Sequence, residues 1–314
     1  MKPLLAWHQW LKVCVCVFVF AGSGISAYAG VLGGDASVST VSDTRSIEAR
    51  WVSAISADNT TVLRALLDES STAAGLASEE NTASVSPGNT VSQPLWQVTA
   101  SNGKTALMVA CKVGDEALAM RLVELGSNIK AKTITDGTAF MFAVLGDQQR
   151  LAQWLIGLGA NMDAQGSNGW TGVMIASAKG LDKTLQWLLS EGANAQTPDV
   201  YGFSPLMRAA DNGHSDAVRA LINQKVSEQG IDVHWQDELN NTALHYAVAG
   251  DHHEIVQLLL RANASASTPN SAGLSALDLA MSAVSAADDP AVSETLQQRR
   301  EEVLETLQRS SESG

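Results

Sequence analysis

Three histidines in the C-terminal third of the chain could in principle bind a metal ion: His245, His252 and His253. Two histidines at positions i and i+4 of a helix would share one face, whereas His245 precedes the other two by seven and eight residues. That spacing places the histidines on either side of a turn between two helices. We therefore predict structural roles for them, with no metal site and no bound cofactor.

Sequence motifs of catalysis are missing from the chain after residue 29. It contains no Gly-x-Ser-x-Gly elbow, no phosphate-binding loop and no Cys-x-x-Cys pair. The alternative is an enzyme built on the polar stretch 69–101, but beyond Glu69 this stretch has no His or Cys and only two acidic residues, Glu79 and Glu80. We therefore predict that the protein is not an enzyme.

Sulfur-containing side chains offer a second possible chemistry. Cys111 is the one cysteine after residue 29 and stands beside Ala110 in an expected helix, so we predict a small buried residue rather than a reactive thiol. Four methionines recur at one register position and are expected to form a stripe through an adaptable core. The alternative, sacrificial thioethers that consume oxidants, requires accessible sulfur atoms. These methionines are Met108, Met141, Met174 and Met207.

The first 29 residues have the composition of a secretory signal peptide. Lys2 and Lys12 precede the apolar run 13–21, and small residues end at an A-x-A cleavage site over 27–29. The run is shorter than the roughly 18 to 20 residues of a spanning helix, which argues against an uncleaved membrane anchor. We expect a mature periplasmic protein without stable membrane insertion after signal cleavage, beginning with a flexible leader at 30–44.

The charge balance is strongly acidic. The chain has 20 basic and 33 acidic residues, a net charge of −13, and removal of the signal would take away two basic residues and no acidic ones, leaving −15. Nucleic acids and anionic membrane surfaces favour clusters of Lys and Arg. The composition therefore argues against both as partners. It permits a basic partner protein, although solubility alone also explains a negative net charge.

A repeat of about 33 residues must position all of these side chains. A Thr or Ser opens each unit, an Ala follows five residues later, and an apolar pair stands 17 and 18 residues after the Thr or Ser in the first five units. Such a pattern predicts stacked pairs of short helices, with small residues where helices approach closely. The openings are Thr105, Thr138, Thr171, Ser204, Thr242 and Ser275, and the alanines are Ala110, Ala143, Ala176, Ala209, Ala247 and Ala280.

The repeated segments resemble the ankyrin repeat, whose signature is T-P-L-H-x-A. The resemblance rests on Thr242-Ala-Leu-His-Tyr-Ala and Ser204-Pro-Leu-Met-Arg-Ala, and it covers roughly residues 102–281. It implies an all-α solenoid of helix-turn-helix units with short hairpin-like fingers and a concave face built from fingers and first helices. It also implies that His245 bonds near its turn and that His252 lies between helices.

The domain boundaries follow from this register. We expect an ankyrin-repeat domain over 45–281, with a degenerate first repeat at 45–68, a disordered insertion at 69–101, regular repeats over 102–270 and a partial last repeat at 271–284. Within the insertion, Leu95 and Trp96 could fold back onto the stack or meet a partner. Alternation over 231–236 predicts a more extended finger there. Residues 285–314 are expected to form a capping helix and tail on a monomer, a coiled-coil dimer being the alternative.

The resemblance also predicts where a partner would bind. The positions just before the Thr or Ser and at the end of the first helix face the concave side of the ankyrin fold. The aromatic side chains there are the candidate hot spots, although packing under a neighbouring finger is the alternative for Trp170 and Phe203. The candidate partner-binding residues are Trp170, Phe203, Tyr201, Trp235, Lys112, Lys179, Asp211 and Asn212.

The leading functional hypothesis is a non-catalytic module that binds another protein in the bacterial periplasm. Some exported ankyrin proteins accompany a catalase and support peroxide resistance, and others resemble immunity proteins that neutralise a toxin acting in the envelope. The sequence leaves both open. Asn59, Asn240 and Asn263 stand in glycosylation sequons, which permits a secreted eukaryotic protein, but the short signal and the style of the repeats favour a bacterial one.

Overall fold

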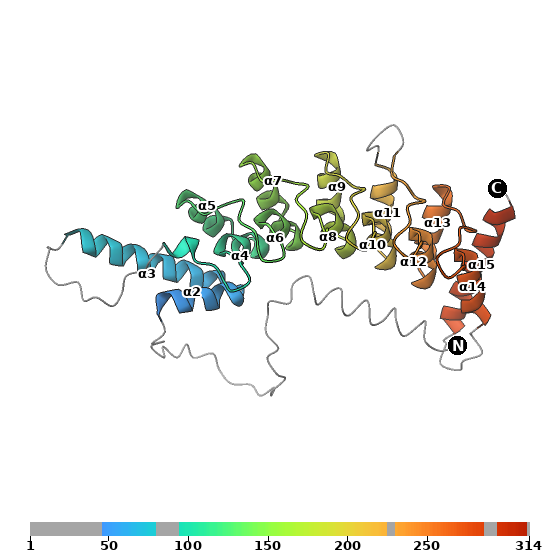
Figure 1. Ribbon diagram of the computed structural model, residues 1–314, viewed down its shortest axis with the longest axis horizontal. Coiled ribbons are helices and arrows are strands. Elements are labelled where there is room, and N and C mark those ends of the chain that lie inside the picture. Colours follow the sequence, from blue (N-terminus) through green and yellow to red (C-terminus); the bar gives the residue numbers. More distant parts are fainter. Residues whose placement is uncertain (1–45, 80–93, 225–229, 286–293, 313–314) are drawn as a thin grey trace, which may run out of the picture. The chain divides into compact units, whose positions relative to one another are not determined.

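The computed structural model describes residues 46–79, 94–224, 230–285 and 294–312 (Figure 1). Within these ranges the elements are helical, without a strand, and one isolated antiparallel bridge joins Lys132 to Thr138. The described chain forms two compact units, an N-terminal unit up to Phe142 and a C-terminal unit from Ala143. No helix in these ranges is both long enough and apolar enough to cross a bilayer. The predicted signal peptide and leader lie outside the described residues.

The N-terminal unit contains two helical pairs. They are α2 (Ile47–Ser56) with α3 (Thr60–Glu79), and α4 (Ala106–Val113) with α5 (Glu116–Glu124); the short 3-10 helix η1 (Leu95–Gln97) lies between the pairs, and α6 (Ala139–Leu145) begins in this unit. Helix α2 begins at Ser46, whose hydroxyl accepts a 3.2 Å hydrogen bond from the Ala49 N–H. Trp51, Leu63 and Leu67 are buried on the facing sides of α2 and α3.

The prediction of a disordered insertion over 69–101 is wrong at both of its ends. Helix α3 continues to Glu79, and the Ser70 and Ser71 hydroxyls donate hydrogen bonds to the Leu67 carbonyl at 2.9 and 2.8 Å. The other end folds back, because Leu95 is buried and the Val98 carbonyl accepts a 3.3 Å hydrogen bond from the Trp51 indole. The middle of the insertion, 80–93, lies outside the described residues.

The C-terminal unit alternates first and second helices, where a first helix is the one that follows the Thr or Ser of each repeat. The first helices are α8 (Gly172–Lys179), α10 (Pro205–Asp211), α12 (Ala243–Ala249) and α14 (Ala276–Ser285). The second helices are α7 (Gln149–Gly157), α9 (Asp182–Ser190), α11 (Ser215–Ile222) and α13 (His253–Arg261). Figure 1 shows them as two parallel rows, as expected for an all-α solenoid.

Local chemistry explains where these helices begin and how they pack. The hydroxyls of Thr171 and Ser204 each accept a 3.2 Å hydrogen bond from the N–H three residues later, which caps α8 and α10. The repeated alanines and the first member of each apolar pair are buried, because they fill the space between successive helices. Asn263 takes φ 65° at the position where three other units have a glycine with positive φ, and asparagine is one of the few residue types that adopt this conformation readily.

A final helix, α15 (Glu294–Glu312), closes the C-terminal unit by packing against α13 and α14. Val303 and Leu307 are buried, and Arg300 pairs with Asp251 through Nε and Oδ1 at 3.1 Å. Since Val303 and Leu307 of α15 are covered within the chain, these contacts favour the capping interpretation over the coiled-coil dimer.

Candidate functional site

The three histidines contact different partners in the structure. His245 is buried, its Nδ1 accepts a 3.1 Å hydrogen bond from the Thr242 N–H, and its Nε2 donates to the Leu274 carbonyl at 3.2 Å. Burial lowers the pKa of His245, so this neutral tautomer is favoured. His253 instead faces Glu302, with 3.1 Å between Nδ1 and Oε2. Among the described residues no group of side chains is arranged to bind a metal ion.

The sulfur atoms are equally inaccessible. All four methionines of the stripe are buried, which contradicts the sacrificial-thioether alternative because oxidants cannot reach them. Two of them replace the signature histidine as capping groups: the sulfur of Met108 accepts the Thr105 N–H at 3.4 Å, and that of Met207 accepts the Ser204 N–H at 3.5 Å. Cys111 is buried, and burial raises the pKa of its thiol to about 12.

Fingers and first helices of the C-terminal unit form an extended surface that carries exposed aromatic and polar side chains. We call it the finger surface: helices α8, α10 and α12 with the fingers 166–170, 199–203 and 237–241. Each finger is closed by a backbone hydrogen bond between its first N–H and last carbonyl, at 2.9, 2.9 and 3.0 Å in that order. The hairpin-like shape is therefore part of the fold.

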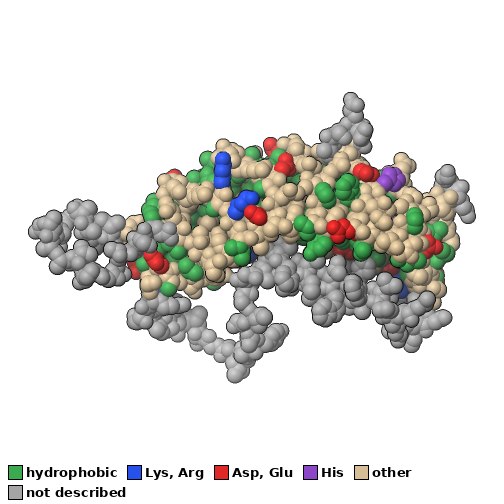
Figure 2. All heavy atoms as spheres, in the orientation of Figure 1, with side chains coloured by type: hydrophobic (Ala, Val, Ile, Leu, Met, Phe, Trp, Pro, Cys, Tyr) green, Lys and Arg blue, Asp and Glu red, His purple; other side chains and the backbone are tan. Residues whose placement is uncertain are grey.

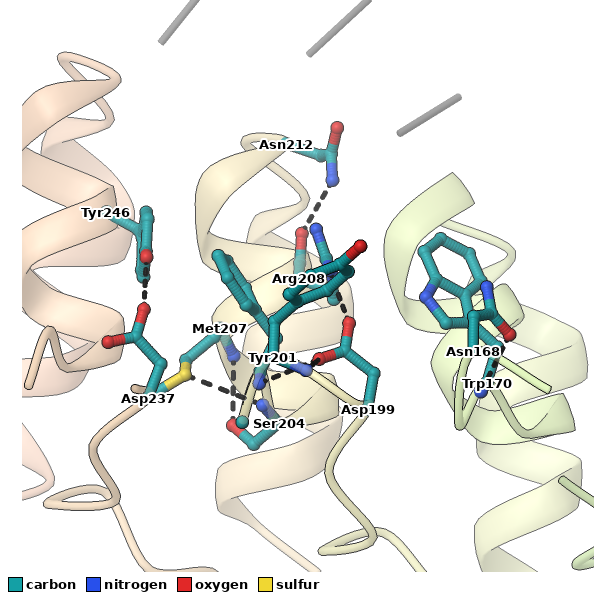
Figure 3. Close-up of polar contacts among 12 residues, drawn as sticks. Asn168, Trp170, Asp199, Tyr201, Ser204, Met207, Arg208, Asn212, Asp237 and Tyr246 are labelled. Carbon is teal, nitrogen blue, oxygen red and sulfur yellow. Dashed lines mark hydrogen bonds and ion pairs between the residues drawn. The ribbon is translucent and has the colours of Figure 1, made fainter. Parts of the chain in front are cut away.

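Buried aspartates hold two of these fingers against their first helices (Figure 3). Asp199 accepts hydrogen bonds from the Tyr201 and Phe203 N–H groups, both at 3.0 Å, and forms an ion pair with Arg208. The side chains of Asp199 and Arg208 are 0% and 6% exposed. A charge pair buried this completely needs satisfied hydrogen bonds, and the finger amides supply them for the carboxylate.

The next repeat uses the same aspartate with a different partner. Asp237 accepts hydrogen bonds from the Leu239 and Asn241 N–H groups at 2.9 and 2.8 Å, and its other oxygen accepts from the Tyr246 hydroxyl. Burial and the Asp237 carboxylate raise the pKa of Tyr246, which keeps the phenol protonated as a donor. Both fingers are thus positioned before any partner arrives.

The two aromatic residues expected to be the main contacts, Trp170 and Phe203, differ in how far they are exposed. Trp170 is half-buried, with its ring 5.4 Å from the guanidinium carbon of Arg208. Phe203 is only 7% exposed: its ring packs on Tyr246 with centroids 4.9 Å apart, and the Arg208 guanidinium carbon lies 3.9 Å above it. The prediction that Phe203 offers a contact surface is therefore wrong, because neighbouring side chains cover it.

Tyr201 and Trp235 have different surroundings. Tyr201 is 55% exposed at the tip of its finger, in front of Arg208 in Figure 3. The Trp235 indole donates a 2.8 Å hydrogen bond to the Gly202 carbonyl, which ties it to the preceding finger. The extended finger predicted from the alternation over 231–236 is not formed; Asp232 accepts a 2.9 Å hydrogen bond from the His234 N–H and makes a turn there.

The polar residues predicted to bind a partner also differ in their exposure and in their ion pairing. Lys179 and Asn212 are exposed at the ends of α8 and α10, and Asp211 is half-buried beside Asn212. Lys112 belongs to the N-terminal unit, where its Nζ pairs with Asp58 at 2.7 Å. Although burial opposes it, hydrogen bonds from Lys104 and Lys112 hold the pKa of Asp58 below its usual value. Lys112 is therefore already paired with a carboxylate that it shares with Lys104.

Sequence reasoning missed the aliphatic side chains at the fingertips. Val200 and Leu239 are 51% and 59% exposed in the C-terminal unit, and Ile134 is 73% exposed in the N-terminal unit. Ile134 and Leu239 are single apolar residues among the polar residues of a turn, where a polar residue is usual, and Val200 follows Asp199 in its own turn. That local contrast is the signal that could have identified them.

Comparison with family models agrees with the geometry. A model described as ankyrin repeats (3 copies) matches residues 51–165 and 140–234, and a second, described as ankyrin repeats (many copies), matches residues 226–280. No curated protein matches the chain significantly. The matched ranges cover the helices α4 to α13 and most of the chain, so the protein belongs to the ankyrin-repeat family.

Proposed function

We propose that the protein is a non-catalytic module that binds another protein on the finger surface of its C-terminal unit. Ankyrin repeats are modules of protein–protein interaction. The observation that carries the proposal is the pair of buried aspartates, Asp199 and Asp237, which hold their fingers in place while Tyr201 stays exposed. A surface that is already ordered loses little conformational entropy when a partner binds.

Trp170 and Tyr201 are the proposed aromatic anchors, with Lys179, Asp211, Asn212 and Trp235 around them. A half-buried Trp and an exposed Tyr on a rigid support are the residue types that dominate interface energies. Phe203 contributes by supporting Arg208 and Tyr246 from beneath.

Affinity capture tests this proposal. The full chain would be immobilised and exposed to an envelope extract beside a Trp170→Ala, Tyr201→Ala double variant. Leu158→Ala, which truncates an aliphatic residue that is 42% exposed at the end of α7, is the matched control. Wild type and control should retain the same protein and the double variant should lose it. Equal capture by all three would contradict the binding surface.

Periplasmic location and physiological role are the finer part of the proposal. The signal-like composition of residues 1–29 supports export, and a cleaved N-terminus near residue 30 in the purified periplasmic fraction would test it. Support of a catalase predicts association with that enzyme and peroxide sensitivity when the protein is lost. Immunity against an envelope toxin, the second candidate, predicts tight one-to-one inhibition of that toxin.

A further inference from the structure

The tips of the fingers in the C-terminal unit form one continuous row. The Val200 N–H donates to the Asn168 carbonyl at 3.0 Å, the Glu238 N–H to the Tyr201 carbonyl at 3.3 Å, and the Ser271 N–H to the Leu239 carbonyl at 2.9 Å. We call these residues, Asn168, Val200, Tyr201, Glu238, Leu239 and Ser271, the fingertip row. Because backbone hydrogen bonds join each tip to the next, the tips themselves lie side by side.

Three neighbouring side chains of the row are apolar or aromatic and largely exposed. Val200, Tyr201 and Leu239 each leave more than half of their surface accessible. Isolated exposed aliphatic residues are ordinary, but three on adjacent, hydrogen-bonded turns form a patch. The patch is rigid, since Asp199 and Asp237 bind the amides at these same tips.

The charged residues of the two fingers that carry the patch, 199–203 and 237–241, are all acidic. Between Asp199 and Asp251 the Lys and Arg residues that the structure describes are Arg208 and Arg219. Arg208 is buried against Asp199, and Arg219 pairs with Glu254 on a second helix at 2.7 Å, so neither presents a cation to the row. Glu238 is exposed within the row itself. Figure 2 shows further acidic side chains spread over this part of the chain.

We propose that the fingertip row binds a segment of the partner protein in which an apolar side chain is flanked by Lys or Arg residues. The apolar residue packs against Tyr201 and Leu239, and the flanking cation pairs with Glu238. Complementary charge of this kind steers association and selects the partner. The inference rests on the proposed protein-binding function and adds the chemistry of the segment that is recognised.

Selection from a random peptide library displayed on phage tests the inference directly. The immobilised full chain should enrich peptides with Lys or Arg within about two positions of a Leu, Phe or Trp. A synthetic copy of an enriched peptide should bind Leu239→Ala at least about tenfold more weakly, as expected for loss of a hot-spot contact, and Leu158→Ala as tightly as wild type. Glu238→Lys should shift the selection toward acidic flanks. Enrichment of uncharged or acidic peptides by the wild type, or no enrichment, would overturn the inference.

The same variants separate this inference from the proposed function. If the envelope partner is lost by the Trp170→Ala, Tyr201→Ala double variant but binds Leu239→Ala and Glu238→Lys like the wild type, the binding function stands and the basic segment is refuted. If it weakens at least about tenfold on Leu239→Ala and Glu238→Lys and at high salt, the inference is supported.

Discussion

Truncation of the buried ion pair between Arg208 and Asp199 should destabilise the protein strongly. Removing either partner leaves the other charge buried and unpaired, which costs about 3–5 kcal/mol of unfolding free energy. Asp199→Ala belongs at the upper end of this range, because it also removes the acceptor for the Tyr201 and Phe203 N–H groups. Arg208→Ala belongs at the lower end, because Asp199 keeps those two donors.

A double-mutant cycle measures the coupling between the two side chains. The double variant should lose about 1–3 kcal/mol less than the sum of the single losses, since the partners touch. Urea unfolding followed by both Trp fluorescence and circular dichroism gives the free energies and tests whether the transition is cooperative. Arg219→Ala is the matched control: it breaks an exposed pair, with side chains 49% and 59% accessible, and should cost less than about 1 kcal/mol.

Hydrogen exchange adds a local readout to the same variants. The Tyr201 and Phe203 amides should exchange faster in Asp199→Ala than in Arg208→Ala, because only the first substitution removes their acceptor. An Arg208→Ala variant within about 0.5 kcal/mol of wild type, or strictly additive losses in the cycle, would refute the argument that this pair holds the finger.

Three further predictions concern the core. Burial raises the pKa of the Cys111 thiol from 9.0 to about 12, so the unfolded thiol ionises first. Stability should therefore fall as the pH rises from 9 toward 12, with up to about 1.4 kcal/mol per pH unit from this group; urea midpoints should fall more steeply for the wild type than for Cys111→Ala, and equal slopes would contradict the assignment. Gly213 has φ 77°, and the Cβ of Gly213→Ala would lie 2.6 Å from the His252 ring, whereas Gly192 has φ 86° and open space around its Cβ position. Gly213→Ala should therefore lower the urea midpoint more than Gly192→Ala, and equal losses would contradict the clash. Met207→His should raise stability by about 0.5–1.5 kcal/mol, because an imidazole can cap the helix and also donate to the next finger, and an unchanged melting temperature would count against this.

Much of the fold could be predicted from the order of the residues. The Thr and Ser openings, the buried alanines and the apolar pairs repeat at a nearly constant interval, and helix capping and helix packing depend on residues only a few positions apart. The helix starts of α8 and α10 followed from local chemistry alone. The resemblance to ankyrin repeats then placed the finger surface.

The accessibility of individual side chains in the site was decided by contacts between distant residues. The sequence predicts that Phe203 is a surface aromatic residue, but in the structure it packs against Tyr246, which lies 43 residues later in the chain. The sequence likewise predicts that Lys112 is available to a partner, but in the structure it pairs with Asp58. Likewise, the end of the insertion is held by a hydrogen bond from the Trp51 indole to the Val98 carbonyl. The sequence by itself determined the period, the helices and the stacked core, because these depend on short-range patterns. Only the tertiary structure decided which candidate side chains remain exposed to a partner, because burial depends on which neighbours the stacking of repeats brings together.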